Sequence, residues 1–442
     1  MQTSKLSTAT ILGHLGIEAL NAMQLASIEA NETHKDVILL SATGSGKTLG
    51  FLLPLLGRLD DASKDTQAMV IVPSRELALQ IEEVFRSMRA GYKVTCCYGG
   101  HLRETEENNL VQPPALIIGT PGRLADHIRR GNITVDAIQT LILDEFDKSL
   151  EYGFQEEMAF IIGSLKNVSK RILTSATEAV EIPDYVGMTA PERLNFLTGS
   201  EEKEQRLEVK TVKTDNSDKS EALFRILCAA GGKPAIVFCN HREAVERTSQ
   251  LLHARGIVNE YYHGAMEQQE RDSALCKFRN GTANVLVTTD LASRGLDIAH
   301  VRYIIHYQLP HAEDIYTHRN GRTARMDASG TAVLIIGPGE YVPPYLGDNV
   351  EEMRLPVDAE LPEKPKWTTL FISGGKKDKI NKIDIVGFLA QKGGLKKEDI
   401  GLIEVKDFFA FAAIRKSKAN TTVAAVRDQK IKNKKLKIEI AR

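Results

Sequence analysis

The sequence predicts an α/β protein of three units: two tandem lobes built on parallel sheets, followed by a small α+β domain. Its 442 residues are too many for one hydrophobic core and suggest about three domains. Short apolar runs alternate with longer amphipathic stretches in two successive series, which is the rhythm of strand, helix and strand. The carboxyl-terminal part then differs from the rest in charge, which indicates a separate unit.

The first lobe is expected over residues 1–198. Its apolar runs have the length of buried strands and fall at 37–40, 68–72, 116–118, 141–143 and 171–173. Amphipathic stretches long enough for helices separate these runs. A strand that continues through a helix into a parallel strand makes a right-handed crossover, so helices would cover both faces of the sheet.

The second lobe is expected over residues 207–337, after a polar linker at 199–206 that has no apolar periodicity. Its strand-like runs fall at 235–239, 285–287, 303–305 and 332–336. Two such lobes joined by a hinge would enclose a cleft. The carboxyl ends of their strands are where open α/β sheets bind ligands.

A proline-rich acidic stretch over 338–363 precedes the third unit and is expected to act as a semi-stiff tether. Residues 364–442 carry 20 Lys and Arg against 8 Asp and Glu, a net charge of +12, and the remainder of the chain carries −13. A phosphate-bearing partner is the simplest reason for such a basic unit. Its segments follow the β-α-β-β-α-β order of a ferredoxin-like domain, at 367–372, 382–391, 400–405, 408–414, 421–430 and 436–440.

A nucleoside-triphosphate site is predicted where a strand-like run passes through a glycine-rich turn into an apolar helix. Backbone N–H groups in such a turn surround phosphate oxygens, while Lys47 reaches the terminal phosphates and the Thr48 hydroxyl faces Mg²⁺. An ordinary turn is the alternative, but Gly46, Lys47 and Thr48 complete the phosphate-binding pattern. The loop residues expected to contact ATP are Thr43, Gly44, Ser45, Gly46, Lys47 and Thr48.

An acidic segment at the end of the run 141–143 complements this loop. Mg²⁺ keeps much of its hydration shell and favours one or two carboxylates, so Asp144 is expected to hold the metal through water. Glu145 is then the candidate that orients or deprotonates the attacking water. A solvated acidic turn is the alternative, although carboxylates at the carboxyl end of a parallel strand lie at the ligand-binding edge.

Two arginines of the second lobe are further catalytic candidates. Arg322 and Arg325 are expected to face the γ-phosphate across the cleft as arginine fingers when the lobes close. A solvated basic face is the alternative. The segment 290–297, which follows another strand, would help to form the same cleft. The residues that could couple the lobes through hydrogen bonds are Asp147, Ser175, Thr177 and His318.

Composition argues against several classes of protein. The chain is 42% hydrophobic and 26% charged, as in ordinary soluble globular proteins. Its five cysteines form no C-x-x-C pair, which argues against a disulfide framework and against a zinc site. Cys96 and Cys239 lie in strand-like runs, where a thiol usually serves as a small buried hydrophobe. There is no leader-like start and no apolar run of about 18 residues, so we expect a cytoplasmic protein without membrane contact.

With its motifs in family order over residues 10–335, the chain resembles a DEAD-box RNA helicase. The matching segments 44–48, 144–147, 175–177 and 318–325 imply two RecA-like lobes, ATP and Mg²⁺ as cofactors, and RNA-dependent ATP hydrolysis. Gln24 matches the family's adenine-reading glutamine, and Asp297 would join the ATP site. The resemblance also implies RNA contacts from Pro73, Arg75, Gly99, Gly100, Thr120, Gly122, Arg123, Gln268, Arg271, Thr289 and Arg294.

Two departures from the family pattern concern the nucleotide site. Phe146 stands where the name-giving alanine would be, but the metal and water roles belong to Asp144 and Glu145. Residues 1–23 contain no Phe, Tyr or Trp, and Asn21-Ala22 replaces the usual Thr-Pro. Adenine stacking by that route is therefore not expected, and selectivity for ATP should be looser.

The basic domain resembles the RNA-binding domain of the DbpA-type subgroup, which is RRM-like and recognises a structured element of large-subunit ribosomal RNA. Phe371, Phe409 and Phe411 would share one face of its sheet, either to stack bases or to pack a small core. A phosphate-contacting strip is expected from Lys430, Lys432, Lys434, Lys435 and Lys437.

These features predict a monomeric ATP-dependent RNA helicase that closes its lobes on ATP and RNA, opens a short duplex locally and acts on ribosomal RNA during ribosome assembly. One alternative is an RNA clamp or chaperone in which unwinding is not essential, which would be expected to lack Lys47, Glu145 or an arginine finger. The other is a DNA-directed superfamily 2 motor, for which a zinc-binding or winged-helix module would be typical. The chain has the three catalytic features and neither module pattern.

Overall fold

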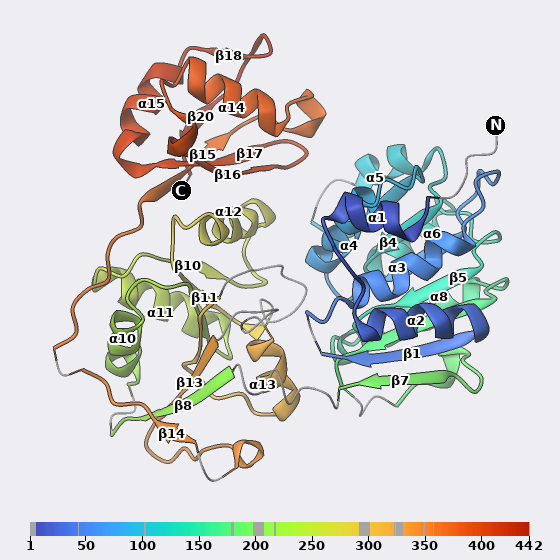
Figure 1. The fold of residues 1–442 in the computed structure, drawn as a ribbon, viewed down its shortest axis with the longest axis horizontal. Helices are drawn as coiled ribbons and strands as arrows, with labels where there is room; N and C mark the ends of the chain where they lie inside the picture. Colours follow the sequence, from blue (N-terminus) through green and yellow to red (C-terminus); the bar gives the residue numbers. More distant parts are fainter. Residues whose placement is uncertain are drawn as a thin grey trace. The chain divides into compact units, whose positions relative to one another are not determined.

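The computed structural model describes residues 6–42, 44–100, 103–177, 181–197, 207–215, 218–290, 301–321, 323, 330–347, 350–356 and 358–441. They fall into two compact units, one with the described residues up to 197 and the other with those from 207 onward. The second unit contains both the second lobe and the carboxyl-terminal domain (Figure 1). The predicted fold class is confirmed, with two parallel sheets followed by a small antiparallel sheet.

The sheet of the first lobe is parallel, with the strand order β3-β4-β2-β5-β6-β1-β7. The five expected runs are all strands, and β3 and β7 add to them. The strands are β1 (Asp36–Ser41), β2 (Ala68–Ile71), β3 (Val94–Cys97), β4 (Leu116–Gly119), β5 (Thr140–Leu143), β6 (Lys170–Ser175) and β7 (Glu192–Phe196). Because every pairing is parallel, all carboxyl ends lie at one edge of the sheet.

Helices cover both faces of this sheet, so the lobe has two apolar cores. On one face, Leu52 of α3 and Ile81 of α4 pack with Val70 of the sheet, and on the other Leu124 of α6 and Ile161 of α8 pack with its neighbours in β2. Continuous burial of the strands follows from this double cover. The helices are α1 (Thr8–Leu15), α2 (Ala22–Thr33), α3 (Lys47–Arg58), α4 (Arg75–Ser87), α5 (Arg103–Leu110), α6 (Pro121–Arg129), α7 (Phe146–Glu151) and α8 (Gln155–Ser164).

The second lobe repeats this plan, with the parallel order β10-β11-β9-β12-β13-β8-β14. Its strands are β8 (Leu207–Lys213), β9 (Ala235–Phe238), β10 (Asn259–Tyr262), β11 (Val285–Thr288), β12 (Tyr303–His306), β13 (Gly330–Ile336) and β14 (Glu351–Glu352). Its helices are α10 (Ser220–Ala229), α11 (Arg242–Ala254), α12 (Gln268–Arg279) and α13 (Glu313–Asn320). No described helix of either unit is long and apolar enough to cross a membrane.

The segment expected to be a tether packs against the second lobe. β14 adds to the edge of the sheet beside β8, and Met353, Leu355 and Ala359 pack on the apolar core of the lobe. Further along, Pro362 lies against Gly232 beside a small pocket. These apolar side chains gain free energy by leaving water, so the segment is anchored rather than loose. Its sequence pattern of prolines and acids did not indicate this, because the apolar residues between them are scattered.

The carboxyl-terminal domain has the expected ferredoxin-like topology, with the antiparallel order β16-β17-β15-β20. Its strands and helices are β15 (Trp367–Ile372), α14 (Lys382–Gln391), β16 (Ile400–Val405), β17 (Ala410–Arg415), α15 (Ala419–Val426) and β20 (Ile438–Ile440). Leu370, Ala412 and Ile403 point to one face of the sheet and pack with Ile385 and Val426 of the two helices. A short hairpin of β18 (Lys430–Ile431) and β19 (Lys434–Lys435) connects α15 to β20.

The opposite face of this sheet contacts the second lobe. The Thr369 hydroxyl is buried and accepts a hydrogen bond of 2.8 Å from the Asn280 amide, and Arg279 lies 3.4 Å from Glu404. Phe371, Phe409 and Phe411 share this face as expected, with ring centroids 5.4 to 5.9 Å apart. Phe411 is only 1% exposed. Its ring is therefore part of a packed cluster and is not an open platform for a base.

Candidate active site

The turn between β1 and α3 has the form of a phosphate-binding loop. Gly44 and Gly46 have φ angles of 77° and 91°, a region that glycine enters at little cost. Gly46 is the N-cap of α3, so the positive end of the helix dipole lies at the loop. The buried Lys47 donates hydrogen bonds from Nζ to the carbonyl oxygens of Ser41 and Ala42, which hold its ammonium group over the turn.

Gln24 reaches the same loop from α2. Its Nε2 donates to the Gly46 carbonyl at 3.2 Å, while Asn21 and Gln24 cap the helix through reciprocal hydrogen bonds of 2.9 and 3.0 Å. Asn21 Nδ2 also donates to the Ser45 carbonyl at 3.0 Å. The structure therefore joins Gln24 to the phosphate loop and adds Asn21, which the sequence presented only as a departure. The Asn-x-x-Gln spacing of a capping box is the signal that could have identified it.

Asp144 and Glu145 follow β5 and are buried at the same edge of the sheet. The Thr174 hydroxyl of β6 donates to Asp144 Oδ1, and the Glu145 N–H lies 3.1 Å from Asp144 Oδ1 and 3.2 Å from Thr174 Oγ1. Glu145 has a left-handed backbone, with φ 49° and ψ 50°, which is uncommon outside glycine. These contacts fix a strained residue at the centre of the site. Thr174 was missed in the sequence, although it lies next to Asp144 once β5 and β6 are paired.

The donor set at this edge fits Mg²⁺. Burial raises the pKa of the Asp144 carboxyl, against the hydrogen bond from Thr174 and the charge of Lys47. A carboxylate whose charge burial disfavours is stabilised by a nearby cation. With the Thr48 hydroxyl in the first turn of α3, the site offers the few oxygen ligands that a largely hydrated Mg²⁺ requires.

Three of the predicted coupling residues, Asp147, Ser175 and Thr177, are joined by hydrogen bonds. Thr177 Oγ1 donates to Asp147 Oδ2 at 3.3 Å, and Ser175 Oγ accepts from the Thr177 N–H at 3.1 Å. Burial raises the pKa of the Asp147 carboxyl, while the charges of Lys148 and Lys47 lower it. The loop after β6 is thereby tied to the start of α7, directly beside the nucleotide residues.

The predicted RNA-binding residues of the first lobe follow three strands that are neighbours in the order β3-β4-β2. Because these strands are parallel, the segments after them share one edge of the sheet, beside the nucleotide segments after β5, β6 and β1. Arg75 lies over the Tyr98 ring, 4.7 Å from its centroid, which joins two of the segments. The residues brought to this edge are Pro73, Arg75, Gly99, Gly100, Thr120, Gly122 and Arg123.

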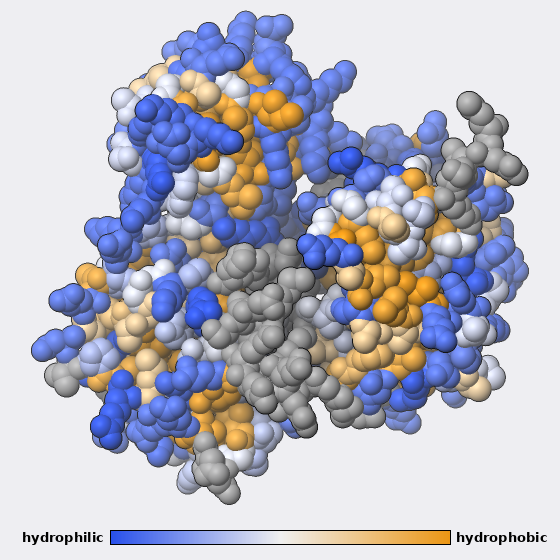
Figure 2. Space-filling model, in the orientation of Figure 1, coloured by the Kyte–Doolittle hydropathy of each residue, from blue (hydrophilic) through white to orange (hydrophobic). Residues whose placement is uncertain are grey.

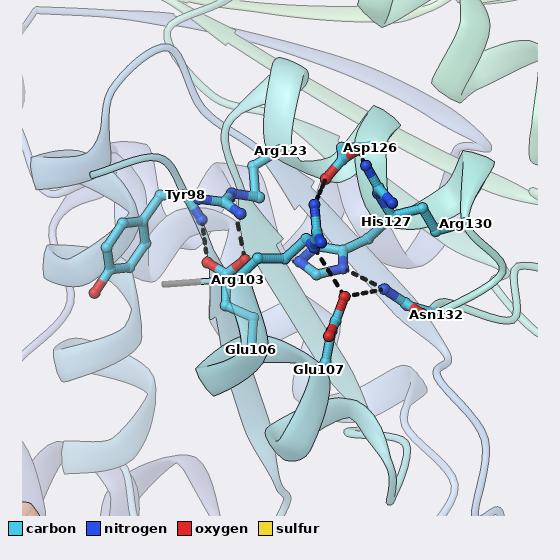
Figure 3. A network of polar contacts seen from close by, with 9 residues as sticks. All are labelled: Tyr98, Arg103, Glu106, Glu107, Arg123, Asp126, His127, Arg130 and Asn132. Carbon is cyan, nitrogen blue, oxygen red and sulfur yellow. Dashed lines mark hydrogen bonds and ion pairs between the residues drawn. The ribbon is translucent and has the colours of Figure 1, made fainter. Parts of the chain in front are cut away.

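A buried polar network lies beneath these segments (Figure 3). Glu106 of α5 is 1% exposed and His127 of α6 is fully buried, and Glu106 Oε2 lies 2.6 Å from His127 Nε2 and 3.4 Å from Arg123 Nε. Glu106 Oε1 accepts from the Tyr98 N–H at 2.8 Å. Neither Glu106 nor His127 was identified from the sequence. A glutamate among the other polar residues of α5 carries no signal of burial in the sequence.

The second lobe places its described candidates on separate elements. Arg271 donates to Gln268 within the first turn of α12, Thr289 follows β11, and His318 is buried on α13 with Nδ1 2.6 Å from the Asp314 carbonyl. The candidates that lie outside the described residues are Thr43, Arg294, Asp297, Arg322 and Arg325.

Arg319, one residue after His318, is fully buried and has a structural role. Its guanidinium donates to Asp290 at 2.6 and 3.1 Å, to the Gln308 carbonyl at 2.9 Å and to Asn240 at 2.8 Å. These bonds connect α13 to the segments after β9, β11 and β12. Arg319 therefore anchors α13 to the lobe.

His306 next to this anchor makes the second lobe sensitive to acid. Its ring is stacked with Phe238 and Tyr316, and burial, with a smaller effect of the Arg319 charge, lowers its pKa to about 3. The unfolded ring has a pKa of about 6.5, so below that pH the unfolded state takes up a proton that the folded state excludes. The free energy of unfolding therefore keeps its full value above about pH 6.5 and falls as the pH is lowered toward 3. At pH 5 the loss is about 2 kcal/mol.

Urea denaturation followed by circular dichroism at pH 7.5 and pH 5 measures this effect. A His306→Phe variant is expected to be less stable at pH 7.5, because Asn320 loses its 3.1 Å partner, yet to lose less stability than the parent on going to pH 5. Equal pH dependence of the two proteins would contradict the assignment.

Comparison with known families and structures agrees with this geometry. Residues 21–184 match the DEAD/DEAH box helicase family, residues 218–327 the helicase conserved C-terminal domain and residues 369–440 the DbpA RNA binding domain. The first two matches cover the two parallel-sheet lobes, and the third covers the small antiparallel domain.

Similar proteins cover nearly the whole chain. The ATP-dependent RNA helicase DbpA of Escherichia coli (strain K12) is 32% identical over 98% of this chain and 96% of its own length. The protein of the same name from Bacillus subtilis (strain 168) is 28% identical over 97% and 96%. The fold also resembles S. cerevisiae Dbp5 bound to RNA and ADP BeF3, with a TM-score of 0.65 at 24% identity, over 75% of this chain and 88% of that one.

Proposed function

Because this chain belongs to the DEAD-box ATP-dependent RNA helicases and carries a DbpA RNA-binding domain, we propose that it acts on structured large-subunit ribosomal RNA during ribosome assembly. It is an RNA-dependent ATPase of that family. The observation that best supports the proposed RNA target is the basic hairpin of the carboxyl-terminal domain. The alignments with the E. coli and B. subtilis proteins named DbpA cover 98% and 97% of this chain and 96% of each relative, so they extend into this domain.

In this proposal the first lobe supplies the chemistry. Lys47 and the loop N–H groups would bind the phosphates, Asp144 and Thr48 would hold Mg²⁺ largely through water, and Glu145 would orient or deprotonate the attacking water. The metal supplies charge neutralisation at the phosphates. Thr174 fixes Asp144 and the strained Glu145 backbone in place. Arg322 and Arg325 would complete the site on lobe closure.

RNA is held on the first lobe by the segments after β2, β3 and β4. N–H groups, Thr120 and the guanidinium groups of Arg75 and Arg123 suit phosphate oxygens, which position a strand without reading its sequence. Specificity must then come from a second contact, which the basic domain provides.

The hairpin of β18 and β19 presents that contact. Its turn residues Lys432 and Asn433 have φ angles of 47° and 65°, as in a two-residue type I′ turn, and the surrounding surface is mainly hydrophilic (Figure 2). Lys432, Lys434 and Lys435 are about half exposed or more and pair with surface carboxylates at 2.8 to 3.0 Å. Such exposed pairs contribute at most about 1 kcal/mol each, so RNA phosphates can replace the carboxylates.

Replacing Lys432, Lys434 and Lys435 together by Gln removes three expected phosphate contacts. The affinity for a structured ribosomal RNA fragment is therefore expected to fall by about 10- to 100-fold. The slope of log K against log salt should fall by about 2 to 3. ATPase activity at saturating poly-RNA should stay near the parental value. Fluorescence anisotropy across a salt series, together with ATPase activation curves, measures both effects.

The matched control replaces Lys392, Lys396 and Lys397 by Gln, which removes the same charge from exposed positions in the segment that follows α14. This variant should keep the affinity and the salt slope within about 3-fold and one unit of the parent. Equal losses in the two variants would mean that net charge, and not the hairpin, determines binding. Parental behaviour of the hairpin variant would exclude the hairpin as the RNA contact.

A further inference from the structure

The polar network under the RNA side of the first lobe has an unusual composition for a buried site (Figure 3). Glu106 is enclosed with His127 and has three partners: it accepts from the Tyr98 N–H at 2.8 Å, lies 2.6 Å from His127 Nε2 and forms an ion pair with Arg123 Nε at 3.4 Å. Asn132 Nδ2 donates to His127 Nδ1 at 3.1 Å, which leaves Nε2 as the nitrogen that carries the proton toward Glu106. The contacts therefore form a directed chain from Asn132 through His127 to Glu106.

The stability of the fold does not require this buried network of Glu106, His127 and Arg123. Burying a carboxylate is costly even when it is paired, and apolar side chains of similar volume would fill the space at least as well. Unlike apolar contacts, hydrogen bonds and ion pairs fix the orientation of the groups that they join. Glu106 connects the residue before the Gly99-Gly100 segment with the guanidinium of Arg123 in the first turn of α6.

We propose that Glu106 and His127 are positioning residues that set two RNA-gripping segments, the one at Gly99-Gly100 and the one that contains Arg123, at a fixed spacing. This inference rests on the proposed function, in which both segments hold the RNA backbone. Arg123 Nε pairs with Glu106 Oε2, so the rest of the guanidinium group has a defined direction. The Tyr98 N–H donates to Glu106 Oε1, so a shift of one segment would displace the other through Glu106.

A metal ion is the competing explanation for the cluster. Cys97 Sγ, a Glu106 oxygen and a His127 nitrogen lie within 4.8 Å of one another, a donor set that zinc accepts. However, burial raises the pKa of the Cys97 thiol well above its ordinary value, and the Arg123 cation is already beside Glu106. A protonated thiol and an adjacent guanidinium both disfavour a bound cation, so hydrogen bonding is the better assignment.

The test is a Glu106→Gln variant of the full chain, with RNA-stimulated ATPase kinetics as the readout. Gln keeps the shape and can still accept from the Tyr98 N–H, but it loses the charge that holds Arg123 and His127. The RNA concentration for half-maximal stimulation should rise about 10-fold, the scale of one misplaced charged hydrogen bond to phosphate. kcat at saturating RNA and KM for ATP should stay within about 2-fold, a split that a general loss of folding would not produce.

Matched variants separate the possible results. Glu104→Gln removes the same charge from an exposed position of α5 and should change nothing. Asn132→Ala, a less buried change that releases the His127 ring, should raise the half-maximal RNA concentration about 3-fold and serves if Glu106→Gln does not fold. On an Arg123→Ala background, Glu106→Gln should have little further effect, because it acts through Arg123.

Failure of the inference is distinguishable from failure of the proposed function. If Arg123→Ala leaves the half-maximal RNA concentration unchanged, the proposed RNA contact is wrong. If Arg123→Ala raises it and Glu106→Gln does not, only the positioning role is overturned. Stoichiometric zinc in the parent protein, absent from Glu106→Gln and from Cys97→Ser by elemental analysis, would also overturn it in favour of a metal site.

Discussion

A Glu145→Gln variant is expected to bind ATP and RNA but to hydrolyse ATP at least about 100-fold more slowly than the parent, the scale of losing a general base. Glutamine cannot take the proton of the attacking water, yet it has nearly the same shape. The backbone of residue 145 is held by its N–H contacts with Asp144 and Thr174, so the new side chain should occupy the same place. Single-turnover hydrolysis at saturating RNA measures the effect without interference from product release.

The control is Glu156→Gln, which makes the same charge change at an exposed position of α8. It should hydrolyse ATP at the parental rate. RNA-stimulated turnover of Glu145→Gln close to that of the control would remove Glu145 from the mechanism.

Arg322→Ala and Arg325→Ala are each expected to slow hydrolysis by about 10³-fold, the lower end of the effect of removing an arginine finger. The ATP affinity of the first lobe should be unchanged, because the phosphate loop and Gln24 belong to the first unit and the proposed fingers would act only on closure. Equilibrium binding of a fluorescent ATP analogue and single-turnover hydrolysis separate the two quantities.

Arg319→Ala provides the contrast within the same segment. This arginine is buried against Asp290, Gln308 and Asn240, so its loss should lower the unfolding temperature by about 5 °C or more by leaving buried polar groups unpaired. If the Arg322 and Arg325 variants resembled Arg319→Ala, with lost stability and a normal rate per folded molecule, they would be structural and not catalytic.

The strands that could be predicted from the sequence are those buried on both faces. β5 (Thr140–Leu143) is a continuous apolar run because helices cover it on each side. β7 and β10 were not predicted, because they lie at sheet edges, where polar residues such as Glu192 and Asn259 are tolerated. The packing of Met353, Leu355, Ala359 and Pro362 on the second lobe was not predicted for another reason: it depends on which apolar residues meet in space, and sequence periodicity does not report that.

The residues of the site also fall into those that a local sequence pattern predicts and those that depend on contacts across the fold. Lys47, Asp144 and Glu145 were predicted because their chemistry requires certain residue types directly after a strand, which is a local pattern. Thr174 and Glu106 contribute through contacts made across the fold, with Asp144 on a neighbouring strand and with Arg123 on a different helix. No local pattern marks such residues, so only the paired sheet and the packed helices reveal them.

The two-residue strand β14 has a consequence for the behaviour of the protein at high concentration. The outermost strand of a sheet offers unpaired N–H and C=O groups on which another chain can add, and long, flat, apolar edges are prone to aggregation. This edge of the second lobe is short and acidic, because both of its residues are exposed glutamates, Glu351 and Glu352, beside Lys210 and Lys213 of β8. A second molecule that tried to extend the sheet here would meet like charge and too few backbone groups to form a ladder. We therefore expect the short segment that ends the sheet also to disfavour self-association at this edge.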